Sequence, residues 1–312
     1  MNVLFVCSGN KTKGPGVVVK SQADTLAQQN IKVSYFLIRG SGFIGYLKNV
    51  SPLAKHIKDN DFDIIHAHYS LSAIVASFAI LLSKRKPIVV SLMGSDAQLK
   101  GVYRILVKLF YRFFWFKTIV KGEEMKQSLN LSYAVVIPNG VDIDKIINIE
   151  KEHYVSEIGN VTPILFAADP LRESKNWQLA SAAFEILGTV IKVVYNVSHE
   201  KIIKEIFDSQ IVLLTSKWEG SPNIVKEAMA CNCPIVATDV GDVRWLFGDE
   251  PGHFITSFDP NDVAEKIKLA LQFAKERGRT NGRQRIIELG LDSETVAKRI
   301  VEVYNSVLKD VQ

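Results

Sequence analysis

Glu219-Gly-Ser-Pro-Asn-Ile-Val-Lys-Glu227, continued by Ala228-Met-Ala-Cys-Asn-Cys-Pro-Ile-Val-Ala-Thr-Asp-Val-Gly241, is the most informative stretch of this chain. Pro222 suits the start of a helix, where its missing N–H costs nothing. Glu219 then stands just before the helix, and Glu227 about one and a half turns inside it. Free N–H groups at a helix start favour an anion, and carboxylates accept hydrogen bonds from hydroxyls. The spacing therefore suits a ligand with both hydroxyls and phosphate, such as a sugar nucleotide.

Charge is distributed unevenly along the 312 residues. Residues 1–150 hold 19 Lys and Arg against 10 Asp and Glu, a net +9, so the remainder carries −4 of the overall +5. A basic first half indicates an anionic partner for that half. The length suggests two domains of about 150 residues each. The 47% of hydrophobic residues is ample for two cores.

The three cysteines, Cys7, Cys231 and Cys233, form neither a disulfide framework nor a zinc-ligand pattern. They are expected to be small buried residues of a protein in a reducing compartment. Residues 1–7 lack the basic start of a signal peptide and are expected to form a first strand. These features favour a cytoplasmic location.

The longest uncharged run, Ile64–Ser83, is about long enough to span a membrane. Two histidines, a tyrosine and four serines interrupt it. A strand over 64–67 followed by a helix over 71–83 fits this run better than a transmembrane segment.

Short apolar runs alternate with helical patterns, which predicts two doubly wound parallel α/β sheets. The expected strands of the first half are Val3–Cys7, Val33–Ile38, Ile64–Ala67, Ile88–Leu92, Thr118–Val120 and Ala134–Ile137. Those of the second half are Ile164–Ala168, Ile191–Asn196, Ile211–Thr215, Pro234–Thr238 and Gly252–Ile255. Expected helices include Val17–Gln29, Gln178–Leu187, His199–Phe207, Asn223–Ala230, Pro260–Arg277 and Ser293–Leu308. A polar stretch places the interdomain linker near 143–160.

Residues 219–241 resemble the donor site of retaining glycosyltransferases with the GT-B fold, of the kind grouped in glycosyltransferase family 4. The pattern of that family is a Glu, seven residues, a second Glu, an Ala-Met-Ala helix and a Pro-Val-Val-Ala-Thr strand. The resemblance covers nearly the whole chain, but is specific only in 164–241 and around 134–142. It implies two Rossmann-like domains that face a cleft.

The domains implied by this resemblance are an acceptor-binding domain over 1–145 and a nucleotide-sugar-binding domain over 146–290. A last helix within 291–312 is implied to pack back toward the first domain. The second domain is short for the family, because only one strand is expected between Lys175 and Ile211.

The resemblance also implies roles for residues of the second half. Arg172 and Lys175 match the basic pair that neutralises the donor diphosphate, where fixed cations favour the charge that builds on a departing group. Glu219 is implied to face the sugar ring, and Glu227 to accept hydrogen bonds from the ribose hydroxyls. The other donor-binding candidates are Gly220, Ser221, Asn223, Ile224 and, near the base, Asn196.

A Gly-rich loop with Gly14 and Gly16 follows the first strand. Its spacing is neither that of a P-loop nor that of a dinucleotide-binding fingerprint. In the resembling enzymes this loop lies under the sugar and diphosphate, where glycine lets the backbone approach closely. An ordinary flexible loop is the alternative.

Two later segments of the first half, Asp63–His68 and Ser91–Asp96, end strands and are expected to open into the cleft. In the second segment, Gly94 and Asp96 are the acceptor-side candidates. The His-Gly pair that the family often carries is Met93-Gly94 here, which leaves a His-assisted step at that site in doubt. His68 is a candidate to serve instead, with a structural histidine as the alternative.

The mechanism implied by the resemblance retains the anomeric configuration. A double displacement requires a carboxylate nucleophile beneath the sugar, and none is obvious. Same-face attack, in which the leaving phosphate takes the acceptor proton, is the alternative, and there the protein supplies mainly position and electrostatics. Neither a metal nor a cofactor is expected beyond the co-substrate, a UDP- or GDP-linked sugar.

Four basic residues recur every four positions: Lys100, Arg104, Lys108 and Arg112. Large apolar and aromatic residues lie between them, a pattern typical of an in-plane helix on anionic lipid. A core helix with a solvated basic edge is the alternative, and the donor-site match argues against nucleic acid. A lipid-linked acceptor on the inner membrane leaflet would explain both features, and a bacterial cell-surface polysaccharide pathway is plausible.

Two other classes of function stay open. One is a non-transferring enzyme of the same fold, such as a sugar-nucleotide epimerase or a phosphorylase. The other is a catalytically silent subunit that binds membrane and a partner. The short second domain and Met93 favour the silent subunit, whereas intact Lys175, Glu219 and Glu227 argue against it.

Overall fold

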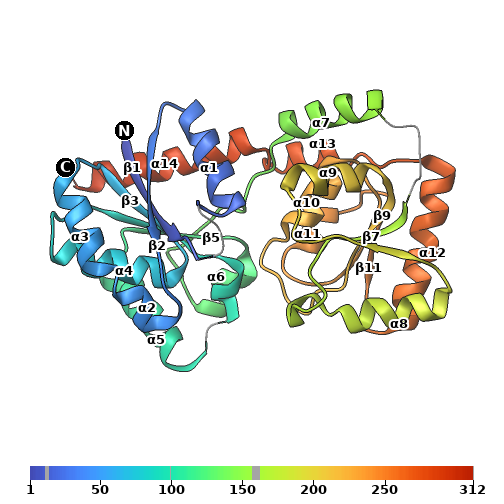
Figure 1. Ribbon diagram of the computed structural model, residues 1–312, viewed down its shortest axis with the longest axis horizontal. Helices are drawn as coiled ribbons and strands as arrows, with labels where there is room; N and C mark the ends of the chain where they lie inside the picture. Colours follow the sequence, from blue (N-terminus) through green and yellow to red (C-terminus); the bar gives the residue numbers. More distant parts are fainter. Residues whose placement is uncertain (11–13, 99, 157–161, 312) are drawn as a thin grey trace. The chain divides into compact units, whose positions relative to one another are not determined.

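The computed structural model describes residues 1–10, 14–98, 100–156 and 162–311 and divides into two compact units (Figure 1). Unit 1 comprises Met1–Gly140 and Ser293–Gln312, and unit 2 comprises Val141–Asp292. The chain therefore passes between the units at 140 and 292, near the expected boundaries at 145 and 290.

Unit 1 is built on a six-stranded sheet with the order β2-β1-β3-β4-β5-β6, and its strand pairings are parallel. The strands are β1 (Asn2–Ser8), β2 (Lys32–Ile38), β3 (Ile64–His68), β4 (Ile88–Ser91), β5 (Lys117–Val120) and β6 (Val135–Val136). The helices are α1 (Val17–Gln28), α2 (Gly42–Leu47), α3 (Val50–Asp59), α4 (Ser70–Leu81), α5 (Gly101–Phe113), α6 (Glu123–Leu129) and α14 (Ser293–Val311), with the 3-10 turn η1 (Gly94–Gln98).

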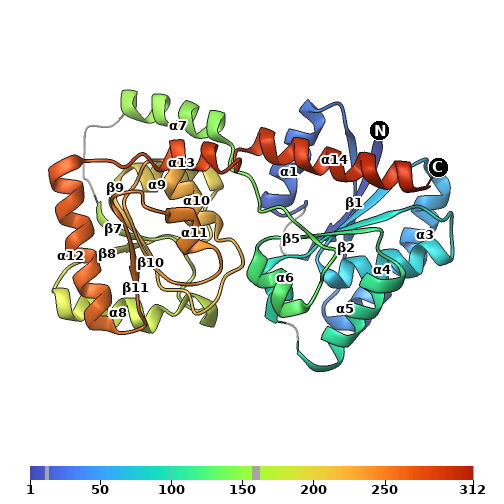
Figure 2. The same cartoon turned by 180° about the vertical axis from the view of Figure 1, so that it is seen from behind.

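Alternate side chains of β1 point into two separate cores, because successive residues of a strand face opposite sides of the sheet. Leu4 and Val6 pack with apolar residues of α3, α4 and α5. Val3 and Phe5 pack with α1 and with α14, the last helix of the chain. Figure 2 shows α14 beside α1. Both faces of the sheet are thus covered, which explains why its strands are continuous apolar runs.

Unit 2 holds a five-stranded parallel sheet with the order β11-β10-β9-β7-β8. The strands are β7 (Thr162–Phe166), β8 (Ile191–Val193), β9 (Ser209–Leu214), β10 (Ile235–Thr238) and β11 (His253–Thr256). The helices are α7 (Ile143–Ser156), α8 (Trp177–Leu187), α9 (His199–Phe207), α10 (Asn223–Ala230), α11 (Val243–Phe247), α12 (Pro260–Arg277) and α13 (Gly282–Glu288), with the 3-10 turn η2 (Glu173–Lys175). Helices α8 and α12 cover one face, while α7, α9, α10, α11 and α13 cover the other.

Two expectations about helices, strands and linkers are wrong. The supposed linker near 143–160 is the helix α7 as far as Ser156, and the remainder, 157–160, lies outside the described residues. Ile146 and Ile149 of α7 are buried in the core of unit 2, so this helix belongs to the domain. The expected strand Ile191–Asn196 stops at Val193, and Asn196 lies in the following loop with a left-handed backbone (φ +56°).

The three cysteines are free and buried, as expected. Within the described residues, no helix combines the length and the apolar character that crossing a bilayer requires. The run 64–83 instead forms β3 and α4, both of which pack into unit 1.

Candidate active site

The loop of residues 219–222, called the Glu219 loop below, leads directly into α10. Pro222 has an extended backbone and is the N-cap of the helix, and its carbonyl accepts from the Lys226 N–H. A proline is tolerated there because the first N–H groups of a helix have no intrahelical acceptor. The expected helix Asn223–Ala230 is confirmed residue for residue.

Glu219 is held by two donors at the carboxyl end of the unit 2 sheet. Its Oε1 accepts from the Lys175 ammonium, in an ion pair, and from Ser216 Oγ at 2.8 Å. The two charged side chains are only 14% and 19% exposed, so solvent screens their attraction less than it would on an open surface. This pair brings together two residues that lie 44 positions apart in the sequence.

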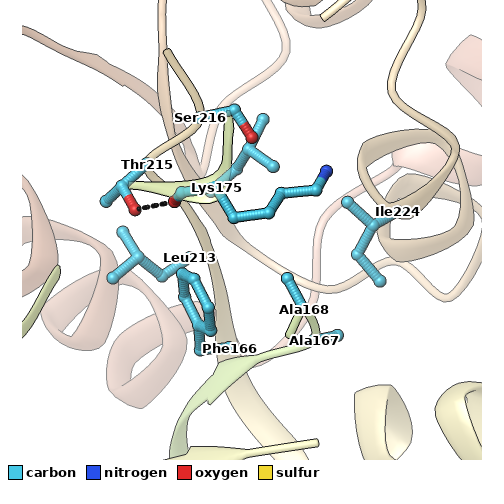
Figure 3. A pocket seen from close by; sticks show the side chains of 9 residues that line it. Phe166, Ala167, Ala168, Lys175, Leu213, Thr215, Ser216 and Ile224 are labelled. Atoms are coloured by element: carbon cyan, nitrogen blue, oxygen red, sulfur yellow. Dashed lines mark hydrogen bonds between the residues drawn. The ribbon is translucent and has the colours of Figure 1, made fainter. Parts of the chain in front are cut away.

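The segment that carries Lys175 is fixed by the end of β9. Thr215 Oγ1 donates to the Lys175 carbonyl at 3.0 Å, and the Lys217 N–H donates to the Ser174 carbonyl at 2.8 Å. The Lys175 side chain extends along a small pocket (Figure 3). The pocket is lined by Phe166, Ala167, Ala168, Lys175, Leu213, Leu214, Thr215, Ser216 and Ile224. It lies where β7 and β9 end, the edge at which parallel α/β sheets usually bind ligands.

Glu227 meets a residue that the sequence did not single out. His199 Nε2 lies 2.9 Å from Glu227 Oε1, and this hydrogen bond is the largest cause that raises the pKa of His199. His199 is the first residue of α9, whose start is fixed by Ser198 Oγ accepting from the Lys201 N–H. The only sequence signal was that His199 lies three residues after Asn196, the candidate expected near the base.

Most of the other expected donor residues lie in unit 2, and the remaining two, Gly14 and Gly16, lie in unit 1. Gly220, Ser221, Asn223 and Ile224 all lie in the Glu219 loop and the first turn of α10. Arg172 is exposed, three residues before Lys175, and Asn196 is exposed in the loop that precedes α9.

Gly14 and Gly16 lie in unit 1, before α1, and part of their loop, 11–13, is outside the described residues. Among the described residues, a Cβ at either glycine would meet nothing within 4 Å, and neither glycine is among those with a positive φ. The described surroundings therefore do not require glycine at these two positions.

His68 does not open into a cleft, contrary to expectation. It is 3% exposed and stacks on His66, with ring centroids 4.4 Å apart. Burial, followed by the charge of Lys121, lowers the pKa of His68 to about 3. The imidazole is therefore neutral at pH 7, and its burial supports the structural alternative over contact with a substrate.

Asp96 is likewise fully buried rather than open to an acceptor. Its oxygens accept from the backbone N–H groups of Met93 (2.7 Å) and Ser70 (3.3 Å). Burial raises its pKa to about 6 even though these hydrogen bonds act in the opposite direction. Asp96 thus ties the turn after β4 to the start of α4, while its neighbour Gly94 is exposed.

The basic residues predicted to meet a membrane lie on or beside α5. Lys100 is its N-cap, and Lys108 and Arg112 lie within the helix. The Arg104 guanidinium donates to the carbonyl of Ser128, so this arginine also has a structural role. Across the described part of the chain, no group of three or more His, Cys, Asp or Glu could hold a metal ion.

The chain matches two protein-family models. Residues 168–285 match the family described as "Glycosyl transferases group 1", and residues 15–145 match "Glycosyltransferase Family 4". The first match contains the pairs Lys175–Glu219 and His199–Glu227, and the second covers most of the sheet of unit 1.

Two curated relatives and one solved structure illustrate the similarity. A Bacillus subtilis protein named "Putative teichuronic acid biosynthesis glycosyltransferase TuaC" is 26% identical over 70% of this chain, and the match spans 64% of that protein, less than two thirds of its length. The Escherichia coli "UDP-Gal:alpha-D-GlcNAc-diphosphoundecaprenol alpha-1,3-galactosyltransferase" is 22% identical over 87% of this chain and 79% of its own length. Anabaena Alr3699/HepE, solved in complex with UDP, has a TM-score of 0.73 at 18% identity, over 98% of this chain and 100% of that one.

Proposed function

We propose that this chain, which resembles glycosyltransferases of the GT-B type and of family 4, moves a sugar from a nucleoside-diphosphate donor to a lipid-linked saccharide, with retention of the anomeric configuration. The observation that carries the proposal is the ion pair of Lys175 with Glu219 at the start of α10. A cation for phosphate, a carboxylate for sugar hydroxyls and the N–H groups of a helix start converge at one sheet edge.

Each half of the donor has a matching partner in this arrangement. Lys175, with Arg172 from the same loop, would neutralise the diphosphate. Glu219 would accept hydrogen bonds from the sugar, and Glu227 from the ribose hydroxyls in place of His199. A UDP-linked sugar is the favoured donor, with a GDP-linked sugar as the alternative, because a solved protein of this fold holds UDP.

The proposed step is a same-face displacement. The bond between the anomeric carbon and the diphosphate oxygen breaks, and that oxygen keeps the electron pair. The acceptor hydroxyl oxygen bonds to the anomeric carbon on the same face, and its proton passes to the departing diphosphate. Lys175 and Arg172 stabilise the charge that develops on the leaving group, which is the largest contribution expected of the protein.

The proposed acceptor is a saccharide carried on a lipid diphosphate, in cell-surface polysaccharide synthesis. Support comes from the name of the Escherichia coli relative, which specifies a diphosphoundecaprenol-linked sugar as acceptor. It also comes from the net charge of +9 on residues 1–150, which suits an anionic acceptor.

The surface of α5 supports binding to anionic lipid on the cytoplasmic side of the membrane. At about 100° per residue, Val102, Ile105, Leu109 and Phe113 fall on one stripe, beside the stripe of Lys108 and Arg112. These four apolar side chains are 71%, 59%, 49% and 73% exposed. The inward face of the same helix is already filled by Val107 and Phe110. An exposed apolar stripe of this kind marks an interaction surface, and the adjoining cations select an anionic one.

Replacing Lys100, Lys108 and Arg112 together by glutamine is expected to release the protein from vesicles that contain phosphatidylglycerol. Each cation near such a surface contributes about 1 kcal/mol, so the triple variant should bind about 10²-fold more weakly. Vesicle sedimentation measures this, and the matched control replaces the exposed Lys268, Lys275 and Arg277 of α12. Equal binding by the two triple variants would contradict a membrane role for α5.

Nucleoside diphosphate is expected to stabilise the wild type and not Glu227→Ala. A ligand at 100 times its dissociation constant adds about 2.7 kcal/mol to the free energy of unfolding. A thermal-shift panel of UDP, GDP, ADP and CDP measures this effect and identifies the base. Glu185→Ala, at an exposed position of α8, is the control and should respond like the wild type.

The outcome of this panel separates the proposal from its alternatives. A shift from one nucleotide together with sugar transfer supports the transferase. Binding without turnover points to a catalytically silent subunit, and phosphate-dependent release of sugar points to a phosphorylase. The absence of a thermal shift with every nucleotide would contradict the proposed donor site.

A further inference from the structure

Lys226 is a charged residue in an apolar position. It immediately precedes Glu227 in α10, yet its side chain is completely buried, beside the buried Val225 and Met229 of the same helix. Lysine is almost never fully buried unless an opposite charge lies close, because removing its ammonium from water costs several kcal/mol. The surroundings of Lys226 must therefore supply an anion.

Asp242, in the turn between β10 and α11, supplies that anion. Burial lowers the pKa of Lys226 to about 8, while attraction to Asp242 and then to Glu227 acts in the opposite direction. Burial also raises the pKa of Asp242 to about 6, against the opposing effect of Lys226. Near pH 7 the two groups carry opposite charges that attract each other, and both Asp242 oxygens are buried, as the Lys226 side chain is.

The turn that holds Asp242 is in close contact with the Glu219 loop. Gly241 has a φ of +59°, and a Cβ on it would lie 2.5 Å from the Gly220 carbonyl oxygen and 2.9 Å from that of Glu219. No side chain fits at Gly241 without displacing the backbone of the loop. The turn after β10 is thus a direct support for the loop that carries Glu219.

Asp242 also reaches the loop through Ser221. The Ser221 hydroxyl is near enough to lower the pKa of the Asp242 carboxyl, and the negative charge of Glu219 acts on the same carboxyl. Within the described residues, however, neither Ser221 Oγ nor either Asp242 oxygen forms a hydrogen bond of normal geometry. The contact between the two segments is therefore the close backbone approach at Gly241, with both Asp242 oxygens buried next to it in the sequence.

The directions of the two pKa shifts indicate that charging these two groups disfavours the folded state. Folding lowers the pKa of the lysine and raises the pKa of the aspartate. Each shift means that the charged form of the group is less favourable in the folded state than in the unfolded state. The contribution of Asp242 to the free energy of unfolding accordingly falls as the pH rises toward 6, where its carboxyl group loses its proton. The contribution of Lys226 rises with pH above 8, where its ammonium group loses its proton. Apolar side chains of similar size would pack at such a place at no cost or with a gain.

We propose that Lys226 and Asp242 are positioning residues: a buried charge pair beneath the Glu219 loop that fixes where Glu219 and Ser221 lie for the donor sugar. The inference rests on the proposed function, because it concerns the loop that would hold that sugar. Both residues act through the loop, and neither touches the donor. The pair lowers the free energy of unfolding but fixes the geometry of the site, as strained or charged groups at functional sites commonly do.

The test compares Lys226→Met, Asp242→Asn and the double variant with the wild type. Each single variant leaves one buried charge without its partner and is expected to lower the melting temperature. The double variant removes both charges and is expected to melt at or above the wild-type temperature. Its kcat at saturating donor should nevertheless stay at least tenfold below wild type, while its thermal shift with the nucleoside diphosphate persists, because Lys175 and Glu227 are intact.

Two outcomes overturn the inference. A double variant whose kcat lies within twofold of the wild type shows that the loop does not need the pair. A double variant that loses melting temperature and nucleotide binding together with kcat shows that the pair is only structural. Neither outcome resembles failure of the proposed function itself, in which the wild type would bind no nucleoside diphosphate and transfer no sugar.

Discussion

Lys175→Ala is expected to lower kcat about 10²- to 10³-fold, the loss typical when one preorganised stabilising group is removed from a developing charge. Lys175 is the cation that the structure places on Glu219, and its backbone is fixed by Thr215. It therefore needs little rearrangement to meet a departing diphosphate. The measurement is release of nucleoside diphosphate from a UDP-linked sugar, with a short-chain prenyl diphosphate-linked N-acetylglucosamine as acceptor.

Lys217→Ala is the matched control for this effect. Lys217 is a neighbouring lysine that pairs with Glu173, whose side chain is 79% exposed, so the pair is solvated and its loss should change kcat less than twofold. Lys175→Arg should recover part of the activity, because the charge remains while its position shifts. Similar kcat values for Lys175→Ala and Lys217→Ala would show that the Lys175–Glu219 pair is not the catalytic electrostatic site.

Local signals made much of this site predictable from the sequence. Pro222 marks a helix start, and the structure begins α10 at the next residue. The apolar runs predicted two parallel sheets, since each run is long enough for a buried strand and too short for a helix. The carboxylate spacing then placed Glu219 just before that helix and Glu227 about one and a half turns inside it.

What the sequence did not reveal depends on contacts between distant segments. His199 pairs with Glu227 across 28 positions, and nothing local to either residue requires that contact. Lys226 occupies what reads as an ordinary charged helix position, and only the packing of α10 shows that it is buried. The linker expected near 143–160 failed for a different reason: charged residues masked the buried Ile146 and Ile149, whose spacing of three fits a helix.

A long-range hydrogen bond in unit 1 leads to the second large prediction. Tyr304 of α14 is fully buried, and its hydroxyl lies 2.6 Å from His66 Nδ1 on β3, 238 positions earlier in the sequence. The other ring nitrogen of His66 lies 2.9 Å from Ser91 Oγ on β4. Burial, then the neighbouring His68 and Lys121, lowers the pKa of His66 well below its usual value, so its ring is neutral. A neutral imidazole has one donor and one acceptor nitrogen, and the two hydroxyls satisfy both.

Tyr304→Ala is therefore expected to lower the free energy of unfolding of unit 1 by about 3–5 kcal/mol, the usual cost of deleting a buried aromatic ring. Tyr304→Phe keeps the ring but leaves His66 Nδ1 buried without a partner, which costs about 1–3 kcal/mol. Urea unfolding measures both values. Tyr133→Ala is the control, because that side chain is 76% exposed and its loss should change stability by less than about 0.5 kcal/mol.

The variant Tyr304→Ala, studied by amide exchange, also tests to which unit the last helix belongs in energetic terms. Helix α14 follows unit 2 in the sequence, yet its buried residues Ile300, Tyr304 and Val307 share one core with β1 and α1. If that core determines its stability, Tyr304→Ala will move only the unfolding transition of unit 1, observed as amide exchange of β1 and β3, and leave that of β9 and β10 unchanged. Equal loss of protection in both sheets would mean that the two units unfold as one cooperative block. The stability of unit 1 would then not be separable from that of unit 2, which carries Lys175 and Glu219.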